Sequence, residues 1–305
     1  MRTQTILSAA GPLKQRGVTL IELMVGLSIG LLVVAVALGA LMVSRGVTGT
    51  VSDASGIQQQ ASYAMRIIGQ QLRQSGSLFL DLNPSGATTE AAGSLALVPV
   101  GFVATIGTPG GGLDTFDPAT NALGGTASPV ALTAGYSRYM EPLFPGGTAQ
   151  YTGRNCLGGP ADTNTTHQRI ESTFSLNGSE LRCRGNGATA QPLVQNVANF
   201  QVRYLLQDNT STPGNPQIRY FTADNIPDAD GNGQPDWSRI QAVEVCLVLY
   251  GNEAIDMPPG SSYTDCDGST QVNMTSLTGA RARRMHIPFR NVFQLRSQGL
   301  VGSAL

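Results

Sequence analysis

The chain has 305 residues, enough for a membrane segment followed by one large or two small domains. Only 13% of the residues are charged and the formal net charge is -1, so no overall basic field would steer the protein to nucleic acid. The two histidines, His167 and His286, stand far apart in the sequence, and no motif of a hydrolase, a metalloprotease or a phosphate-binding loop is present. We therefore do not expect an enzyme.

The N-terminal region consists of a basic leader and a long apolar run. From Val18 to Val43 the only charged residue is Glu22, and the charged residues before Val18 are all basic. A run of this length can cross the roughly 30 Å apolar core of a bilayer as a helix. The positive-inside rule then keeps the N-terminus in the cytoplasm and exports everything after Val43. Glu22 limits the cost of an acid in a membrane helix by lying in the first turn, near the positive end of the helix dipole.

The stretch Gly17-Val18-Thr19-Leu20-Ile21-Glu22 resembles the class III signal of type IV pilins and pseudopilins. The resemblance implies that residues 1–17 are a leader, which a membrane peptidase removes between Gly17 and Val18. It also implies N-methylation of Val18, although the family's usual first mature residue is phenylalanine. Glu22, the fifth mature residue, would neutralise the amine of a neighbouring subunit during filament assembly.

The helix is predicted to continue past the transmembrane part (18–43) as an amphipathic extension over residues 44–76. Its apolar side chains recur every three to four residues and form one stripe: Ile57, Ala61, Ala64, Met65, Ile68 and Leu72. A sheet in the following domain is the expected partner of this stripe. The glycines at 46, 49 and 56 predict a weak, hinged middle, and Gly76 is the expected C-cap.

The remaining sequence divides into a loop-rich part and a strand-rich part. Residues 77–150 are rich in Gly, Thr, Ala and Pro and predict long loops with short strands near 94–103 and 130–132. Residues 151–305 predict an antiparallel sheet domain, with a hairpin at Asn177-Gly178, strands at 194–206 and 240–250, and a last strand at 285–295. Pro288 places that last strand at an edge or a bulge. The predicted fold class is therefore α+β and pilin-like, a long N-terminal helix packed on an antiparallel sheet, and its layout resembles the large minor pilins of the PilW kind.

Four cysteines in an exported chain favour two disulfides, for which three pairings exist. We predict the sequential pairing, Cys156–Cys183 and Cys246–Cys266, because each bond then closes a short loop and joins a predicted strand to a neighbouring connection. A zinc site is disfavoured because the cysteines lack the close spacing of zinc ligands.

The stretch between Asp228 and Asp236 follows the oxygen spacing of a calcium loop. Counted from the first residue, the candidate ligands are Asp228, Asp230, Asn232, Gln234 and Asp236, with Gly233 at the sixth position. Arg239 stands where the bidentate Glu is required, so Glu244 or Asp224 would have to complete the site. The alternative is a solvated acidic turn, and apart from calcium no cofactor is expected.

The resemblance implies a minor pilin of a type IV pilus, which acts in pilus assembly or initiation as a membrane-held filament subunit. Its partners would be other minor and major pilins, the prepilin peptidase/methyltransferase and the inner-membrane assembly platform. It would cross the bacterial inner membrane once, hold its C-terminal domain in the periplasm, and enter the pilus on assembly. The alternatives are a minor pseudopilin of type II secretion, or an adhesive or DNA-binding exported module on a pilin stalk. The arginines between 281 and 296 are the candidate DNA surface, but a solvated strand flank accounts for them better, so nucleic-acid binding is not expected.

Overall fold

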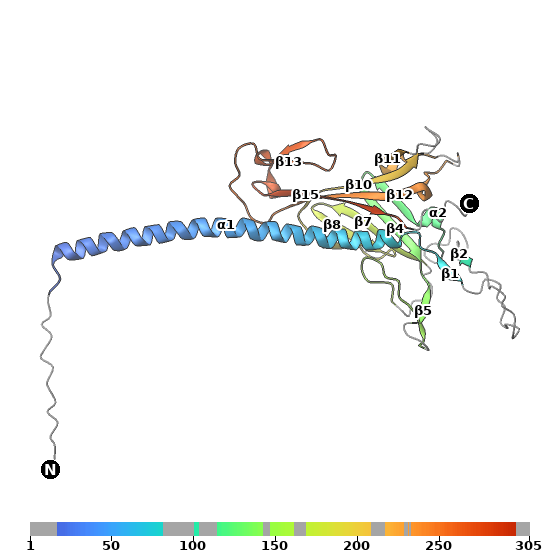
Figure 1. The fold of residues 1–305 in the computed structure, drawn as a ribbon, viewed down its shortest axis with the longest axis horizontal. Coiled ribbons are helices and arrows are strands. Elements are labelled where there is room, and N and C mark those ends of the chain that lie inside the picture. The colour runs from blue at the N-terminus through green and yellow to red at the C-terminus, as the bar shows by residue number, and fades with distance from the viewer. Residues whose placement is uncertain are drawn as a thin grey trace, which may run out of the picture. The chain divides into compact units, whose positions relative to one another are not determined.

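A computed structural model of the chain describes residues 17–81, 101–103, 115–142, 147–161, 169–208, 217–228, 231 and 233–296. The fold is α+β, with one long helix at the start of the chain and antiparallel strands after it (Figure 1). The chain divides into two compact units, Met1–Val51 and Ser52–Leu305. The boundary therefore falls within the long helix and not at its end, because the extension of the helix packs into the β domain.

Helix α1 runs from Leu20 to Gln74. It is continuous through Gly46, Gly49 and Gly56, where we expected a weak middle, because each glycine in a helix costs only about 1 kcal/mol relative to Ala. Within α1, Leu20–Met42 is long and apolar enough to span a membrane. The helix ends as predicted at Gly76, which has a φ of 73° and donates its N–H to the carbonyl of Gly135 at 2.9 Å.

The predicted apolar stripe of α1 faces the core of the Ser52–Leu305 unit. Ile57, Ala61, Ile68 and Leu72 are all at most 2% exposed, and Met65 is partly buried against them. The periodicity therefore identified the buried face of the helix correctly.

A four-stranded antiparallel sheet has the order β11-β10-β12-β15. Its strands are β10 (Val197–Asp208), β11 (Gln217–Phe221), β12 (Ile240–Tyr250) and β15 (His286–Gln294). The alternation of apolar residues predicted β12 at its observed bounds. Pro288 lies opposite Val248 in β15, which is the edge strand of this sheet. Proline has no N–H to donate, and it is therefore tolerated mainly in edge strands.

A five-stranded antiparallel sheet has the order β3-β4-β7-β8-β9. Its strands are β3 (Leu123–Ala127), β4 (Val130–Ser137), β7 (Arg169–Asn177), β8 (Glu180–Gly185) and β9 (Gln191–Val194). The hairpin between β7 and β8 was predicted from Asn177-Gly178. The assignment of residues 77–150 to a loop region, with the β domain beginning at 151, was wrong for β3 and for most of β4, although the short strand expected near 130–132 is the start of β4. Their small residues have a low intrinsic strand preference, which is overridden by the pairing of β4 with β7 on one side and with β3 on the other.

Smaller elements complete the described chain. Three two-stranded ladders pair β1 (Phe79–Asp81) with β2 (Gly101–Val103), β5 (Met140–Pro142) with β6 (Ala149–Tyr151), and β13 (Ser262–Thr264) with β14 (Gln271–Asn273). Short helices are α2 (Pro118–Asn121), η2 (Ala223–Asn225), η3 (Trp237–Arg239), η4 (Met274–Ser276) and η5 (Gly279–Arg281). The strand predicted near 94–103 lies outside the described residues except for β2.

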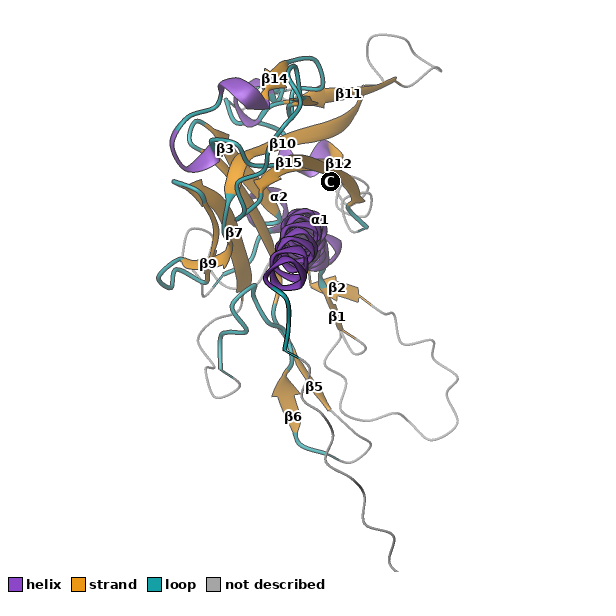
Figure 2. Ribbon diagram, turned by 90° about the vertical axis from the view of Figure 1, so that its left-hand side faces the viewer, coloured by secondary structure: helices purple, strands orange, loops and turns teal. Residues whose placement is uncertain are grey.

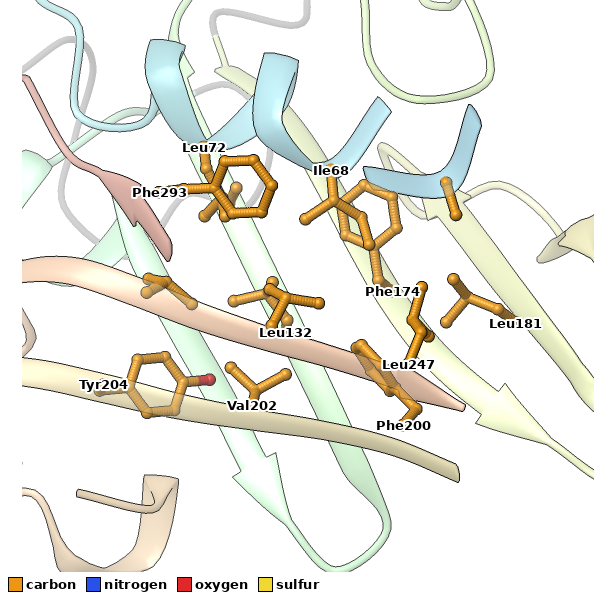
Figure 3. Close-up of a cluster of buried hydrophobic side chains, with 14 of the residues drawn as sticks. Ile68, Leu72, Leu132, Phe174, Leu181, Phe200, Val202, Tyr204, Leu247 and Phe293 are labelled. Atoms are coloured by element: carbon orange, nitrogen blue, oxygen red, sulfur yellow. The ribbon is translucent and has the colours of Figure 1, made fainter. Parts of the chain in front are cut away.

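The main core forms where the domain part of α1 lies between the two sheets (Figure 2). Ile68 and Leu72 of the helix meet Phe174 of β7, Leu247 of β12 and Phe293 of β15 (Figure 3). Strand β12 is buried on both faces, because its other face carries Cys246 and Val248 into a second cluster beneath β13. From the sequence, the alternation of apolar residues predicted burial only of the face that points into the main core.

Candidate functional site: the N-terminal segment and its supporting domain

The start of helix α1 is fixed by Thr19. The Oγ1 atom of Thr19 accepts the N–H of Glu22 at 3.3 Å, and its carbonyl accepts the N–H of Leu23 at 3.1 Å. Thr19 is therefore the N-cap, and Glu22 occupies the first turn, where the helix dipole favours a carboxylate. The Thr-x-x-Glu spacing is that of a capping box and could have identified Thr19 from the sequence.

Gly17 and Val18, which flank the expected cleavage point, lie ahead of the helix. A side chain at Gly17 would meet no atom within 4 Å, and Val18 is 67% exposed. The peptide bond between them is therefore in non-helical, accessible backbone, which is the form in which a peptidase can reach it.

The apolar part of α1 carries exposed side chains among the residues that the structure describes. Its large side chains from Leu20 to Met42 are exposed, and the positions of a Cβ on Gly26 and Gly30 are open. Such a surface has to be covered by lipid or by other helices, and small residues four apart allow close approach of a second helix. The segment thus combines an accessible peptide bond, a capped acid and a helix that is apolar all round.

Two family models match the chain. Residues 12–38 match the prokaryotic N-terminal methylation motif, and residues 162–297 match the type IV pilus-assembly protein W family, PilW. The chain is most like the PilW-type minor pilins. The second match includes every strand from β7 to β15.

Comparison with solved structures finds similarity to a type IV-like pilin from Thermus thermophilus. The identity is 12%, the match covers 79% of this chain and 96% of that chain, and the TM-score is 0.37. A comparison with the curated proteins finds no match.

In this PilW-like chain the cysteines are bonded in the sequential pairing, Cys156–Cys183 and Cys246–Cys266, with Cα–Cα distances of 6.4 Å and 5.6 Å. The first bond joins the connection after β6 to β8. The same connection is held to α1 through Ser172, whose hydroxyl donates to Gln71 Oε1 at 3.0 Å and accepts the N–H of Cys156 at 3.0 Å. Gln71 is 3% exposed, so this polar bridge lies inside the interface between helix and sheet.

The second disulfide holds the β13–β14 hairpin on the outer face of β12, and a charged cluster supports it. Glu244 of β12 is 6% exposed and lies 3.2 Å from Arg290 and 3.9 Å from Arg203. Both arginines also donate to backbone carbonyls of the turn, Arg290 to Cys266 and Arg203 to Asp267, each at 2.8 Å. Because Glu244 is engaged in this way, it is not free to complete a calcium site as suggested from the sequence.

The candidate calcium loop is only partly described. The two carboxylate oxygens of Asp228 accept the N–H groups of Gly231 at 2.8 Å and Gly233 at 2.7 Å, and Asp236 lies 3.7 Å from Arg239. Asp230 and Asn232 lie outside the described residues. Within the described residues, no group of three metal-binding side chains is found.

Three of the arginines between 281 and 296 bond to other groups of the domain. Arg281 donates to Tyr263 and His286, Arg284 to the carbonyls of Gly251 and Asn252, and Arg290 pairs with Glu244. These three side chains are bonded to acceptors within the domain, so they are more engaged than the solvated strand flank expected from the sequence.

Proposed function

We propose that the chain is a minor pilin that takes part in the assembly or initiation of a type IV pilus. The observation that carries the proposal is the capped acid, Glu22, at the start of a helix whose large apolar side chains from Leu20 to Met42 are exposed. A buried carboxylate in an apolar environment costs several kcal/mol unless a cation pairs with it. The amine of Val18 on a neighbouring subunit, exposed by cleavage after Gly17, would supply that cation.

The proposal also includes the membrane location, the orientation, the processing enzyme and the partners of the protein. Residues 18–43 hold the chain in the inner membrane, the leader lies in the cytoplasm and the domain lies in the periplasm. Processing is by the prepilin peptidase/methyltransferase, and the partners are other pilins and the assembly platform. The match to PilW over 162–297 supports the choice of a pilus subunit.

The test uses a strain that lacks the gene and is complemented with the wild type, Glu22→Val or Glu22→Gln. Both variants should insert in the membrane, since they remove a charge from an apolar helix, but surface pili counted by electron microscopy should be lost in both. Glu22→Gln is the matched control for size, so that normal piliation in this strain would show that the charge is not needed. A deletion that leaves pili intact and blocks type II secretion would assign the chain to the secretion system instead.

A further inference from the structure

The four-stranded sheet carries an apolar patch on the face that points away from α1. It consists of Leu205 of β10, Ile218 and Tyr220 of β11, Ala242 of β12 and Val292 of β15, and we call it the outer patch. Ile218, Tyr220 and Val292 are 64%, 53% and 47% exposed. Leu205 and Ala242 belong to neither of the two core clusters, although they are nearly buried. An antiparallel sheet packed on one face usually carries polar side chains on the other, so such a patch marks a surface that something covers.

The pairing register places the residues of the outer patch side by side. Leu205 pairs with Tyr220 on one side and with Ala242 on the other, and Ala242 pairs with Gln294. These four residues form one row across all four strands. Val292 stands two residues before Gln294 in β15, and therefore lies on the same face of the sheet. The patch is thus a continuous surface and not a set of scattered side chains.

The β13–β14 hairpin covers a different part of the same face. Cys246 and Val248 of β12 lie beneath the hairpin in the second core cluster. Between them and the outer patch stands Glu244, which is engaged by Arg203 and Arg290. The exposed apolar surface therefore begins beyond this charged cluster, toward the start of β12 and the end of β15.

The chain leaves β15 next to the outer patch. The N–H of Leu295 donates to the carbonyl of Gln241 at 2.9 Å, one residue before Ala242, and the side chain of Leu295 is buried in the main core. Arg296 follows and is exposed. The next residues of the chain therefore start beside the row formed by Gln294 and Ala242.

Residues 297–305 have the composition and the length to cover the patch. They lie outside the described residues, and their sequence is Ser-Gln-Gly-Leu-Val-Gly-Ser-Ala-Leu, without a charged side chain. Neighbouring strands lie about 4.8 Å apart, so β11 is about 14 Å from β15 across the sheet. An extended segment of this length spans up to about 30 Å, and Leu300 can lie about 13 Å from Arg296, which is over β10 and β11.

We propose that residues 297–305 fold back across the sheet as a strap and cover the outer patch, with Leu300 and Val301 on Leu205 and Tyr220. Burial of apolar surface on both the strap and the sheet favours this contact, and no charged side chain of the strap has to lose its water. The strap would close this face of the domain to other subunits. The inference concerns the domain alone, so it applies equally to a pilus subunit and to a secretion subunit.

The test is photo-crosslinking of the full chain in detergent, with p-benzoylphenylalanine in place of Tyr220. After irradiation and trypsin digestion, which cuts after Arg296, mass spectrometry should find position 220 joined to the 297–305 peptide. The matched control has the same photo-reactive residue in place of Tyr63 of α1, which is 42% exposed and should not capture this peptide. An equal mixture of unlabelled and nitrogen-15-labelled chains distinguishes a strap of the same chain from one supplied by a second copy.

Two variants of the strap make the test specific. Leu300→Asp places a charge on the patch and should abolish the crosslink from position 220, whereas Ser297→Asp places the same charge ahead of the apolar residues and should keep it. The proposal would be overturned by absence of the crosslink in the chain without strap substitutions, by equal capture from position 63, or by an unchanged crosslink in Leu300→Asp. Crosslinks that join labelled to unlabelled chains would also overturn it, because a second copy would then cover the patch.

Discussion

The contact between Gly69 of α1 and Phe293 of β15 allows a sharp test of how the helix packs on the domain. A Cβ on Gly69 would overlap Cε1 of Phe293 and lie 2.9 Å from Cδ1 and 3.2 Å from Cζ. Phe293 is itself 6% exposed and packed in the main core (Figure 3). The ring therefore has little room to move away. Gly56 lies on the same helix, and a Cβ there would meet nothing within 4 Å.

We expect Gly56→Ala to stabilise the protein and Gly69→Ala to be neutral or destabilising. Both gain about 1 kcal/mol of helix propensity, but Gly69→Ala also overpacks the core, at a cost of about 1–3 kcal/mol. Because both variants gain the same helix propensity, the difference between their free energies of unfolding should equal the cost of overpacking at Gly69. Gly56→Ala should be stabilised by about 1 kcal/mol, and Gly69→Ala should be less stable than Gly56→Ala by about 1–3 kcal/mol.

The assay is denaturant unfolding of the full chain in detergent, followed by the fluorescence of Trp237, the only tryptophan. Its ring packs edge-on against Tyr204 at 5.0 Å, so it reports on the domain core. Phe293→Leu in the Gly69→Ala background should recover part of the loss, giving a coupling energy of about 1–2 kcal/mol. Equal stability of Gly69→Ala and Gly56→Ala would refute the close approach of helix and strand.

Four further outcomes are expected. Gly17→Ala should leave the leader attached, as the mass of the intact protein would reveal, whereas the wild type should begin at the next residue. Replacing both Cys246 and Cys266 by serine should lower the free energy of unfolding by about 3 kcal/mol, and a non-reducing peptide map that joined either to another cysteine would contradict the observed pairing. Hydrogen bonds from Thr270 and Ser269 lower the pKa of Asp267 to about 2. The carboxylate of Asp267 should therefore stay ionised, and its turn intact, at pH values where ordinary carboxyls protonate, and the turn should open only as pH falls through about 2. An NMR titration of the carboxyl groups checks this. Calcium, proposed for the 228–236 loop, should raise the melting temperature of the wild type relative to chelator and should have no effect on Asp230→Ala.

The parts of the fold that could be predicted from the sequence are those where the local pattern and the tertiary environment agree. The stripe of α1 and the alternation of β12 are periodic, so their buried faces follow from spacing. Strand β3 and most of β4 were missed because Gly124, Gly125 and the neighbouring small residues carry little strand signal, and because β4 pairs with β7, which comes much later in the chain.

The polar contacts that tie the helix to the domain could not be predicted for a related reason. Gln71 and Asp53 look like ordinary residues of a solvated helix face, and only their distant partners, Ser172 and the 251–253 loop, make them buried and bonded. The position of Glu22 was predictable because its environment is local and is set by Thr19 three residues earlier. Its charged partner on another subunit stays a prediction.

The position of β15 has a consequence for the order of events during export. Among the described strands, β15 is the last along the chain, pairs with β12 alone, and supplies Phe293 to the face of the first helix. A chain that crosses the membrane from its N-terminus, as proposed, delivers α1 first and β15 last. Until residues 286–295 arrive, the edge of β12 is open and Ile68 and Leu72 are incompletely covered, a state prone to pairing with other chains. Completion of translocation is therefore the step that seals the domain, so a chain truncated before His286 should aggregate in the periplasm and not accumulate as a folded, shorter pilin.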